Sequence, residues 1–231
     1  MPSAESISCV VPIYNGGLYL EEAVASIEAQ SWGPVEIIVV DDGSTDDTPR
    51  MIAGLGTRIR AFRKENGGSA SARNLGMAHA SGSFFAFLDA DDEWKPEKLA
   101  VQMARFEHRP ELDLSLCGTE HWWIPELQHE AETHSSLLND RQTGAFPTVL
   151  ARRSLFERTG PLDDTLRHLD LVEWMLRVKD VGGVVETIPD TLVRRRIHHT
   201  NASRQRGDQE IQDRMVIARK RMQRRRPDGR G

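Results

Sequence analysis

The sequence predicts an α/β fold in which a mostly parallel central sheet carries helices on both faces. Short runs of apolar, mostly β-branched residues alternate with helical patterns through the first half of the chain. These runs are apolar at consecutive positions, which is typical of strands that are buried on both faces. The chain has 231 residues and no long linker, so we expect one domain built around one core.

The first half contains four predicted strands, and each is followed by a predicted helix. The apolar runs place the strands at residues 7–11, 35–40, 59–62 and 84–88. Apolar residues at helical spacing, small residues and capping residues place the helices near 20–27, 45–54, 69–80 and 96–106. Because strands and helices alternate, the strands should run parallel and end at the same edge of the sheet.

The pattern is weaker in the second half. We expect an irregular segment over residues 117–143, followed by ordered elements at 146–153, 169–179, 184–188, 192–197 and from Asp208 onward. The chain then divides into a main domain over 1–206 and a basic C-terminal helix and tail over 207–231. Within the main domain, we distinguish a first half over residues 1–116 from a second half over residues 117–206.

Composition excludes several classes of protein. A net charge of −5 argues against a nucleic-acid-binding protein, and two cysteines in apolar runs, Cys9 and Cys117, are expected in the core without a disulfide. No apolar run reaches the length of a membrane span and the first residues lack a signal pattern, so we expect a soluble, cytoplasmic protein. For the Arg-rich tail we favour a solvated helix over contact with an anionic membrane or docking of an acceptor.

Three polar clusters follow three of the predicted strands. They are Tyr14-Asn15-Gly16-Gly17, Asp41-Asp42-Gly43-Ser44 and Asp89-Ala90-Asp91-Asp92. In parallel sheets, ligands bind beyond the carboxyl ends of the strands, so the three loops should converge on one site.

The acids suggest what this site binds. Paired carboxylates such as Asp89 and Asp91 suit Mg²⁺ or Mn²⁺, although a solvated acidic turn would look the same. Asp41 and Asp42 could accept hydrogen bonds from a nucleobase or a ribose, or they could belong to a plain turn. The glycines after the first strand lack the G-x-G-x-x-G spacing, which argues against a Rossmann dinucleotide site.

Several motifs together resemble the family 2 glycosyltransferases of the GT-A fold. CVVPIYNGGLYLEEAVASIEAQSW, VEIIVVDDGSTDDT, NGGSASARNLGMAHASG and FFAFLDADDEW match that family in order and spacing over residues 7–100. A weaker match continues through LARRSLFERTGPLDDTL, HLDLVEWMLRV and RRRIHHTNAS, and reaches residue 203.

The resemblance implies an inverting, metal-assisted transfer of a sugar from a nucleotide-sugar donor, most often a UDP-sugar, to an acceptor hydroxyl. Residues 1–116 would then be the nucleotide-binding half and residues 117–206 the acceptor-binding half. It implies that Pro12, Tyr14 and Asn15 contact the nucleotide, that Asp42 and also Asp41 read the base, and that Arg73 lies near the diphosphate. Asp89-Ala90-Asp91 matches the D-x-D motif, in which the second acid contacts Mn²⁺ or Mg²⁺ and the first the ribose or sugar. His198 is then a candidate third metal ligand.

The general base is where the sequence departs from this family. The usual position falls on Leu171, so we expect the base to be Asp170, with Glu173 as the second candidate. If neither serves, the chain would be a nucleotide-sugar-binding protein with little or no activity. A sugar nucleotidyltransferase would need a Gly-rich loop after the first strand, which this sequence lacks.

The acceptor is not identified by the sequence. A glycan, a lipid carrier, a peptide and a small natural product all fit. We expect the segment over residues 120–143, with Trp122 and Trp123, to order over the bound donor.

Overall fold

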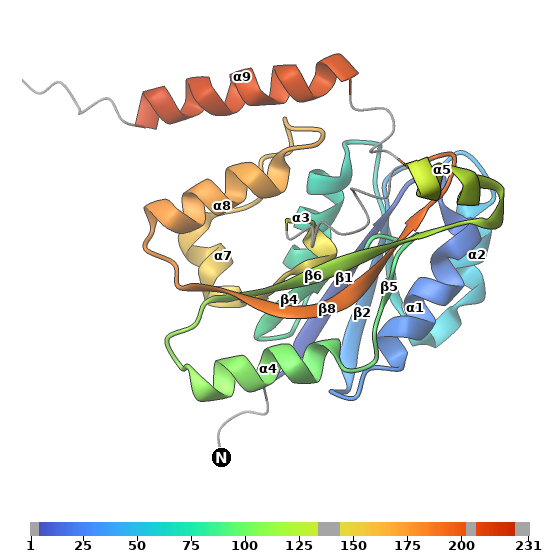
Figure 1. The fold of residues 1–231 in the computed structure, drawn as a ribbon, viewed down its shortest axis with the longest axis horizontal. Coiled ribbons are helices and arrows are strands. Elements are labelled where there is room, and N and C mark those ends of the chain that lie inside the picture. Colours follow the sequence, from blue (N-terminus) through green and yellow to red (C-terminus); the bar gives the residue numbers. More distant parts are fainter. Residues whose placement is uncertain (1–4, 134–143, 202–206, 225–231) are drawn as a thin grey trace, which may run out of the picture.

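The computed structural model describes residues 5–133, 144–201 and 207–224, and in this part the chain folds around one eight-stranded sheet (Figure 1). The strands are β1 (Ile7–Ile13), β2 (Val35–Asp41), β3 (Arg60–Arg63), β4 (Phe84–Phe87), β5 (Glu93–Trp94), β6 (Leu114–Trp123), β7 (Leu150–Arg152) and β8 (Val185–Ile197). The α-helices are α1 (Leu20–Glu28), α2 (Thr48–Gly54), α3 (Ser69–His79), α4 (Lys98–His108), α5 (Gln128–Thr133), α7 (Arg153–Thr159), α8 (Asp170–Asp180) and α9 (Gly207–Arg224). Short 3-10 turns lie at Gly17–Tyr19, Gly56–Arg58, Pro125–Leu127 and Phe146–Thr148.

The sheet is mostly parallel, as the sequence predicts. Its strand order is β3-β2-β1-β4-β7-β6-β8-β5. The pairs β2–β3, β1–β2, β1–β4 and β6–β8 are parallel, whereas β7 runs antiparallel to both of its neighbours and β5 runs antiparallel to β8. The carboxyl ends of β1, β2 and β4 therefore meet at one edge of the sheet.

Each face of the sheet carries its own hydrophobic layer. One layer packs the sheet against α1 and α4, and the other packs it against α3, α7 and α8 (Figure 1). The small residues of α3 explain its close approach to the sheet: a Cβ at Gly76 would lie 2.3 Å from Cγ1 of Val10. Both cysteines, Cys9 and Cys117, are buried and unpaired, as expected.

The expectation of an irregular segment from residue 117 is wrong in its first part. Leu114–Trp123 forms β6, which pairs in parallel with β8 from Leu114↔Val185 to Trp123↔Ile197. The outer part of this pair is half-buried and sets polar residues opposite arginines, such as Glu120 opposite Arg194, so it lacks the apolar run that marks a buried strand. Residues 128–133 form α5, and the rest of the expected irregular segment, 134–143, lies outside the described residues.

One further expectation changes at the C-terminal end. The strands expected at 184–188 and 192–197 are one continuous strand, β8, which runs through Pro189. The Arg-rich helix, α9, lies beside α8 at the top of Figure 1 and is attached through the buried Asp213 and through Lys220, which bonds to Asp163. The other side chains over 210–222 are exposed or half-buried, which agrees with the solvated helix that we expect there. Among the described residues, no helix combines the length and the apolar character that crossing a bilayer requires.

Candidate active site

The turn after β1 is tied to the turn after β2 by Asn15. This residue adopts a left-handed backbone with φ of 49°, which asparagine tolerates better than most residues. Its backbone N–H donates to Oγ of Ser44 at 2.9 Å, and its side-chain oxygen accepts the N–H of Thr45 at 2.8 Å. Pro12 is buried within β1, whereas Tyr14 is 51% exposed. The Tyr14 side chain is therefore accessible to a ligand, whereas Pro12 is not.

Both carboxylate oxygens of Asp42 accept hydrogen bonds from other residues of the protein. Oδ1 accepts hydrogen bonds from Nζ of Lys64 at 2.9 Å and from the N–H of Gly67 at 3.0 Å. Oδ2 accepts the N–H of Gly68 at 2.7 Å, and Gly68 has φ of 92°, a conformation that glycine adopts readily. Asp42 thus anchors the loop that leads into α3.

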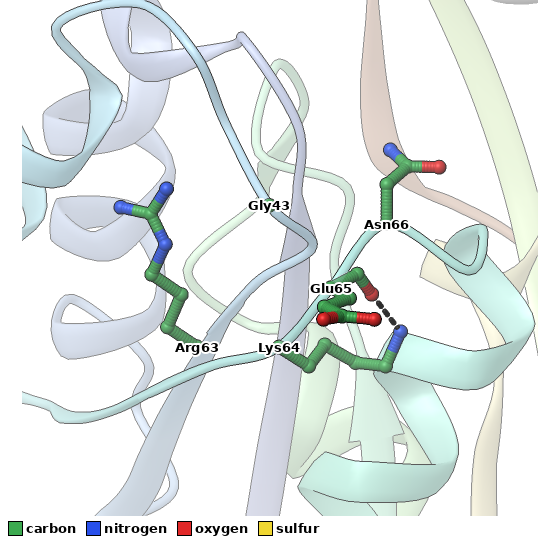
Figure 2. A pocket seen from close by; sticks show the side chains of 5 residues that line it. All are labelled: Gly43, Arg63, Lys64, Glu65 and Asn66. Atoms are coloured by element: carbon green, nitrogen blue, oxygen red, sulfur yellow. Dashed lines mark hydrogen bonds between the residues drawn. The ribbon is translucent and has the colours of Figure 1, made fainter.

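An open cavity of about 560 Å³ lies beside this anchored loop (Figure 2). It is lined by Gly43, Arg63, Lys64, Glu65 and Asn66. The neighbouring Asp41 is buried: its Oδ1 accepts the N–H of Ser44 at 2.8 Å, and its Oδ2 lies 3.5 Å from Nη1 of Arg63. No hydrogen bond from the described residues reaches that Oδ2.

The turn after β4 is joined to the start of α8 by one buried guanidinium. Arg73, on α3, donates from Nη2 to Oδ1 of Asp89 at 2.7 Å and from Nη1 to Oδ2 of Asp170 at 3.1 Å. Its guanidinium carbon also lies 4.1 Å from the centre of the Phe146 ring, within cation–π range. Two acids that are far apart in the sequence therefore share one cation.

Asp91 is held by two residues that follow β8. Its Oδ2 lies 2.8 Å from Nε2 of His198 and accepts a hydrogen bond from Nδ2 of Asn201 at 3.1 Å. The hydroxyl of Thr200 lies 3.0 Å from the other ring nitrogen of His198, which fits an imidazole that donates from Nε2 and accepts at Nδ1. Asn201 is itself 4% exposed, and its side-chain oxygen accepts the N–H of His198 at 2.6 Å.

Arg196 supports the same turn from behind. Its guanidinium carbon lies 4.1 Å from the ring centre of Tyr19 and 4.3 Å from that of Trp122. It donates from Nε to the backbone carbonyl of Asp91 at 3.2 Å and from Nη2 to Glu93 at 2.9 Å. The ring of Trp122, part of the segment that we expect to order over the donor, packs on this arginine.

The comparisons with known proteins identify the family. The sequence profile described as "Glycosyl transferase family 2" matches residues 8–158. The chain belongs to this family. It is 32% identical over 209 residues to an uncharacterized glycosyltransferase of Rickettsia typhi, and 30% identical over 216 residues to one of Nostoc sp.. These matches cover 83% and 84% of the chain, which spans 64% and 66% of the length of those relatives.

Solved structures share the GT-A fold of this family 2 member. TarS of S. aureus superposes with a TM-score of 0.70 at 21% identity, over 92% of this chain and 39% of its own. The mannosyltransferase PcManGT of Pyrobaculum calidifontis, solved with GDP-Man and Mn²⁺, superposes with a TM-score of 0.69 at 20% identity, over 94% of this chain and 65% of its own.

The first turn of α8 brings one of the two predicted bases to the site. Asp170 is 5% exposed and contacts Arg73, and burial raises the pKa of its carboxyl, an effect that the Arg73 guanidinium opposes in part. Leu171 packs in the hydrophobic layer of this face. Glu173 is also buried and receives a hydrogen bond from Nε of Arg177, one turn further along α8, at 2.8 Å.

The metal ligands named from the sequence are not gathered into a ready-made cage. Within the described ranges, no three His, Cys, Asp or Glu side chains form a cluster that could hold a metal ion. Asp89 and Asp91 nonetheless suit a divalent metal ion. Their side chains are 39% and 30% exposed, and carboxylate oxygens together with phosphate oxygens are the usual ligands of Mg²⁺. His198 lies behind Asp91 as its hydrogen-bond partner, and Ala90, between the two acids, is buried in the core.

Sequence analysis missed Arg196 and Asn201 at this site. Both fall in RRRIHHTNAS, where the resemblance is weaker, and nothing in the local pattern separates Arg196 from Arg194 and Arg195. The burial of a guanidinium between two aromatic rings is visible only once β6, β8 and the 3-10 turn at Gly17–Tyr19 are assembled.

Proposed function

We propose that this chain transfers a sugar, with inversion at the anomeric carbon, from a nucleotide-sugar donor to an acceptor hydroxyl, with Mn²⁺ or Mg²⁺ bound. The observation that supports this most strongly is the bridge formed by Arg73 between Asp89 and Asp170. Sugar transfer needs positive charge near the departing diphosphate and a base near the acceptor hydroxyl. The bridge links the D-x-D turn, where the diphosphate would lie, to a buried carboxylate.

The donor is a UDP-sugar in this proposal, and it binds through residues 1–116. Tyr14 is exposed beside the turns after β1 and β2, and the cavity at Gly43 and Lys64 offers room with a polar, charged lining. Structures that share the fold hold UDP-GlcNAc in TarS and GDP-Man in PcManGT, which supports a nucleotide sugar as the ligand class.

Asp91 and Asp89 would hold the metal ion. When bound, the ion supplies positive charge that stabilises the diphosphate as it leaves. His198 and Asn201 orient the Asp91 carboxylate, because both bonds meet the same oxygen, Oδ2, which would leave Oδ1 available to a metal ion.

Asp170 accepts the proton of the acceptor hydroxyl. Its raised pKa makes it a stronger base than a solvated carboxylate, and Arg73 keeps it in one orientation. Glu173 is the second candidate, with its carboxylate already bonded to Arg177. The acceptor, which would bind through residues 117–206, is a glycan, a lipid carrier, a peptide or a small natural product.

A second candidate function is nucleotide-sugar binding without turnover. It is supported by Leu171, which packs in the core at the position where the base is expected. The two functions differ in one measurable property, because only the transferase releases nucleotide from its donor.

The test is a binding screen followed by a turnover assay. UDP and GDP are titrated with and without Mn²⁺, and a nucleotide at 100 times its dissociation constant should stabilise the fold by about 2.7 kcal/mol. UDP release from UDP-sugars is then followed with Mn²⁺ present, and water takes the place of the acceptor hydroxyl. Binding with release supports the transferase, binding without release supports the second candidate, and absence of any metal-dependent nucleotide binding contradicts both.

A further inference from the structure

One carboxylate of the C-terminal helix lies at the beginning of α8. Asp213, on α9, is 1% exposed. Its Oδ2 accepts three backbone hydrogen bonds, from the N–H groups of Arg167 at 3.0 Å, His168 at 2.7 Å and Leu169 at 3.2 Å. These three residues are the last ones before α8 begins at Asp170.

This contact places a buried carboxylate from a distant part of the chain just before the first turn of α8. The N–H groups at the start of a helix have no partners within the helix, and a nearby negative charge is favoured there. The residue before α8, Leu169, makes no side-chain cap bond. Asp213 instead fixes the orientation of the three peptide groups that lead into the helix.

The same helix is attached to this approach at a second point. Nζ of Lys220 donates to Oδ2 of Asp163 at 2.5 Å and lies 3.3 Å from the hydroxyl of Thr165. Lys220 therefore helps to hold α9 in place without touching the peptide groups at 167–169. The two contacts can be separated by mutation.

We propose that Asp213 is a positioning residue for the transfer reaction: by fixing the turn at 167–169, it holds Asp170 against Arg73. Asp170 is the next residue after that turn, and a buried carboxylate can meet Arg73 at 3.1 Å only if the start of α8 is fixed. This inference rests on the proposed function. It gives α9 a part in the active site although it contributes no side chain to the chemistry.

The test compares Asp213→Ala with Asp213→Asn. All three N–H groups meet one oxygen, so the amide oxygen of asparagine can replace it, whereas alanine leaves the groups without an acceptor. We expect Asp213→Ala to lower kcat for UDP release from a UDP-sugar at least about tenfold with KM within about threefold, whereas Asp213→Asn retains most of kcat. Lys220→Ala is the matched control, and its kcat should stay within about threefold of the wild type.

Amide hydrogen exchange gives a readout that does not need turnover. The N–H groups of residues 167–169 should be protected in the wild type and in Asp213→Asn, and should exchange faster in Asp213→Ala. Should the alanine variant fail to fold, Asp213→Ser replaces it, because its shorter side chain cannot span the three groups.

The outcomes separate this inference from the proposed function. A wild type that releases no nucleotide contradicts the function, whereas the exchange data still decide whether Asp213 holds the turn. Unchanged exchange in Asp213→Ala, or an unchanged kcat beside faster exchange, overturns the inference. So does an equal loss of kcat in Lys220→Ala, because the docking of α9 as a whole would then be what matters.

Discussion

The two acidic turns of this sheet edge look alike in sequence and differ in structure. After β2, the Asp42 carboxylate accepts three hydrogen bonds from Lys64, Gly67 and Gly68, and its side chain is 4% exposed. After β4, the side chains of Asp89 and Asp91 are 39% and 30% exposed. The first turn thus uses its acid to shape the protein, and the second keeps carboxylate oxygens accessible.

This difference teaches how a fold assigns roles to identical side chains. A carboxylate whose two oxygens already accept hydrogen bonds from the protein has little capacity left to bind a ligand. A carboxylate that uses one oxygen to bond an arginine or a histidine can still bind a ligand through its other oxygen. The experiments below test that division of roles, and they run from the largest expected effect to the smallest.

The largest effect is expected at Asp170, the proposed base, which Arg73 links to Asp89 in the turn after β4. Removal of a general base costs on the order of 10²–10⁴ in rate, so Asp170→Asn should lower turnover by that factor while donor affinity stays within a few-fold. Steady-state kinetics and calorimetric titration measure the two quantities.

Glu173→Gln is the matched comparison for Asp170→Asn. It breaks a buried ion pair with Arg177, so we expect lower thermal stability with little change in turnover per folded molecule. The reverse ranking of the two variants would move the role of base to Glu173. If neither changes turnover, the base lies outside α8.

Asp91→Ala should abolish metal-dependent binding of UDP while the fold survives. Loss of a residue that merely orients a ligand costs 10–100-fold in metal affinity, so loss of the ligand itself should weaken binding at least about 100-fold. Calorimetry with UDP and Mn²⁺ measures this. Glu120→Ala, at another part-exposed acid, is the control, and unchanged UDP binding in Asp91→Ala would mean that this turn is only an acidic surface loop.

Asp42→Ala should act mainly on stability. It leaves Lys64 and the N–H groups of Gly67 and Gly68 without their acceptor, which costs about 1–3 kcal/mol when buried groups lose a partner. Chemical unfolding measures the change, with the exposed Asp47→Ala as control. If Asp42→Ala leaves stability unchanged and removes UDP binding, Asp42 reads the nucleotide directly and the contrast between the two turns fails.

The smallest effect is a shift in pH dependence. Burial raises the pKa of Asp170 above its ordinary value of 3.8, and a base must be deprotonated to work. Turnover should therefore fall as the pH drops through this raised pKa, at a higher pH than for a solvated aspartate. Folding responds with the opposite sign: protonated Asp170 stabilises the fold at low pH, and this gain is lost as the pH rises through the same pKa. An acid limb at the ordinary value would argue against Asp170 as the base.

Much of the fold could be predicted from the sequence because its signals are local. The strands at residues 7–11, 35–40 and 84–88 are continuous apolar runs, and the structure has strands at all three. Because the strands are parallel, the polar loops that follow them lie at one edge of the sheet. For this reason Asp89 and Asp91 could be assigned from the sequence to the same site as the loops after the first two strands.

The contacts that organise the site could not be predicted, because they join residues that are far apart in the chain. Arg73 and Asp170 are separated by 97 positions, and Arg167 and Asp213 by 46. An arginine among small residues on α3 and an aspartate on a polar helix are locally unremarkable. Strand β6 could not be predicted for a related reason. Its outer half pairs polar side chains with the arginines of β8, so it has no apolar run that would mark a strand.

The burial of Asn201 has a practical consequence for producing this protein. Asn201-Ala202-Ser203 is an acceptor sequence for N-linked glycosylation, which eukaryotic secretory cells carry out on the unfolded chain. Its Nδ2 donates to both Asp91 and the carbonyl of Arg196, so a glycan on that nitrogen would remove one of two donated hydrogens and would have no room in a residue that is 4% exposed. Material secreted from such a host would therefore carry a misassembled D-x-D turn wherever the sugar is attached, and a bacterial host avoids the problem.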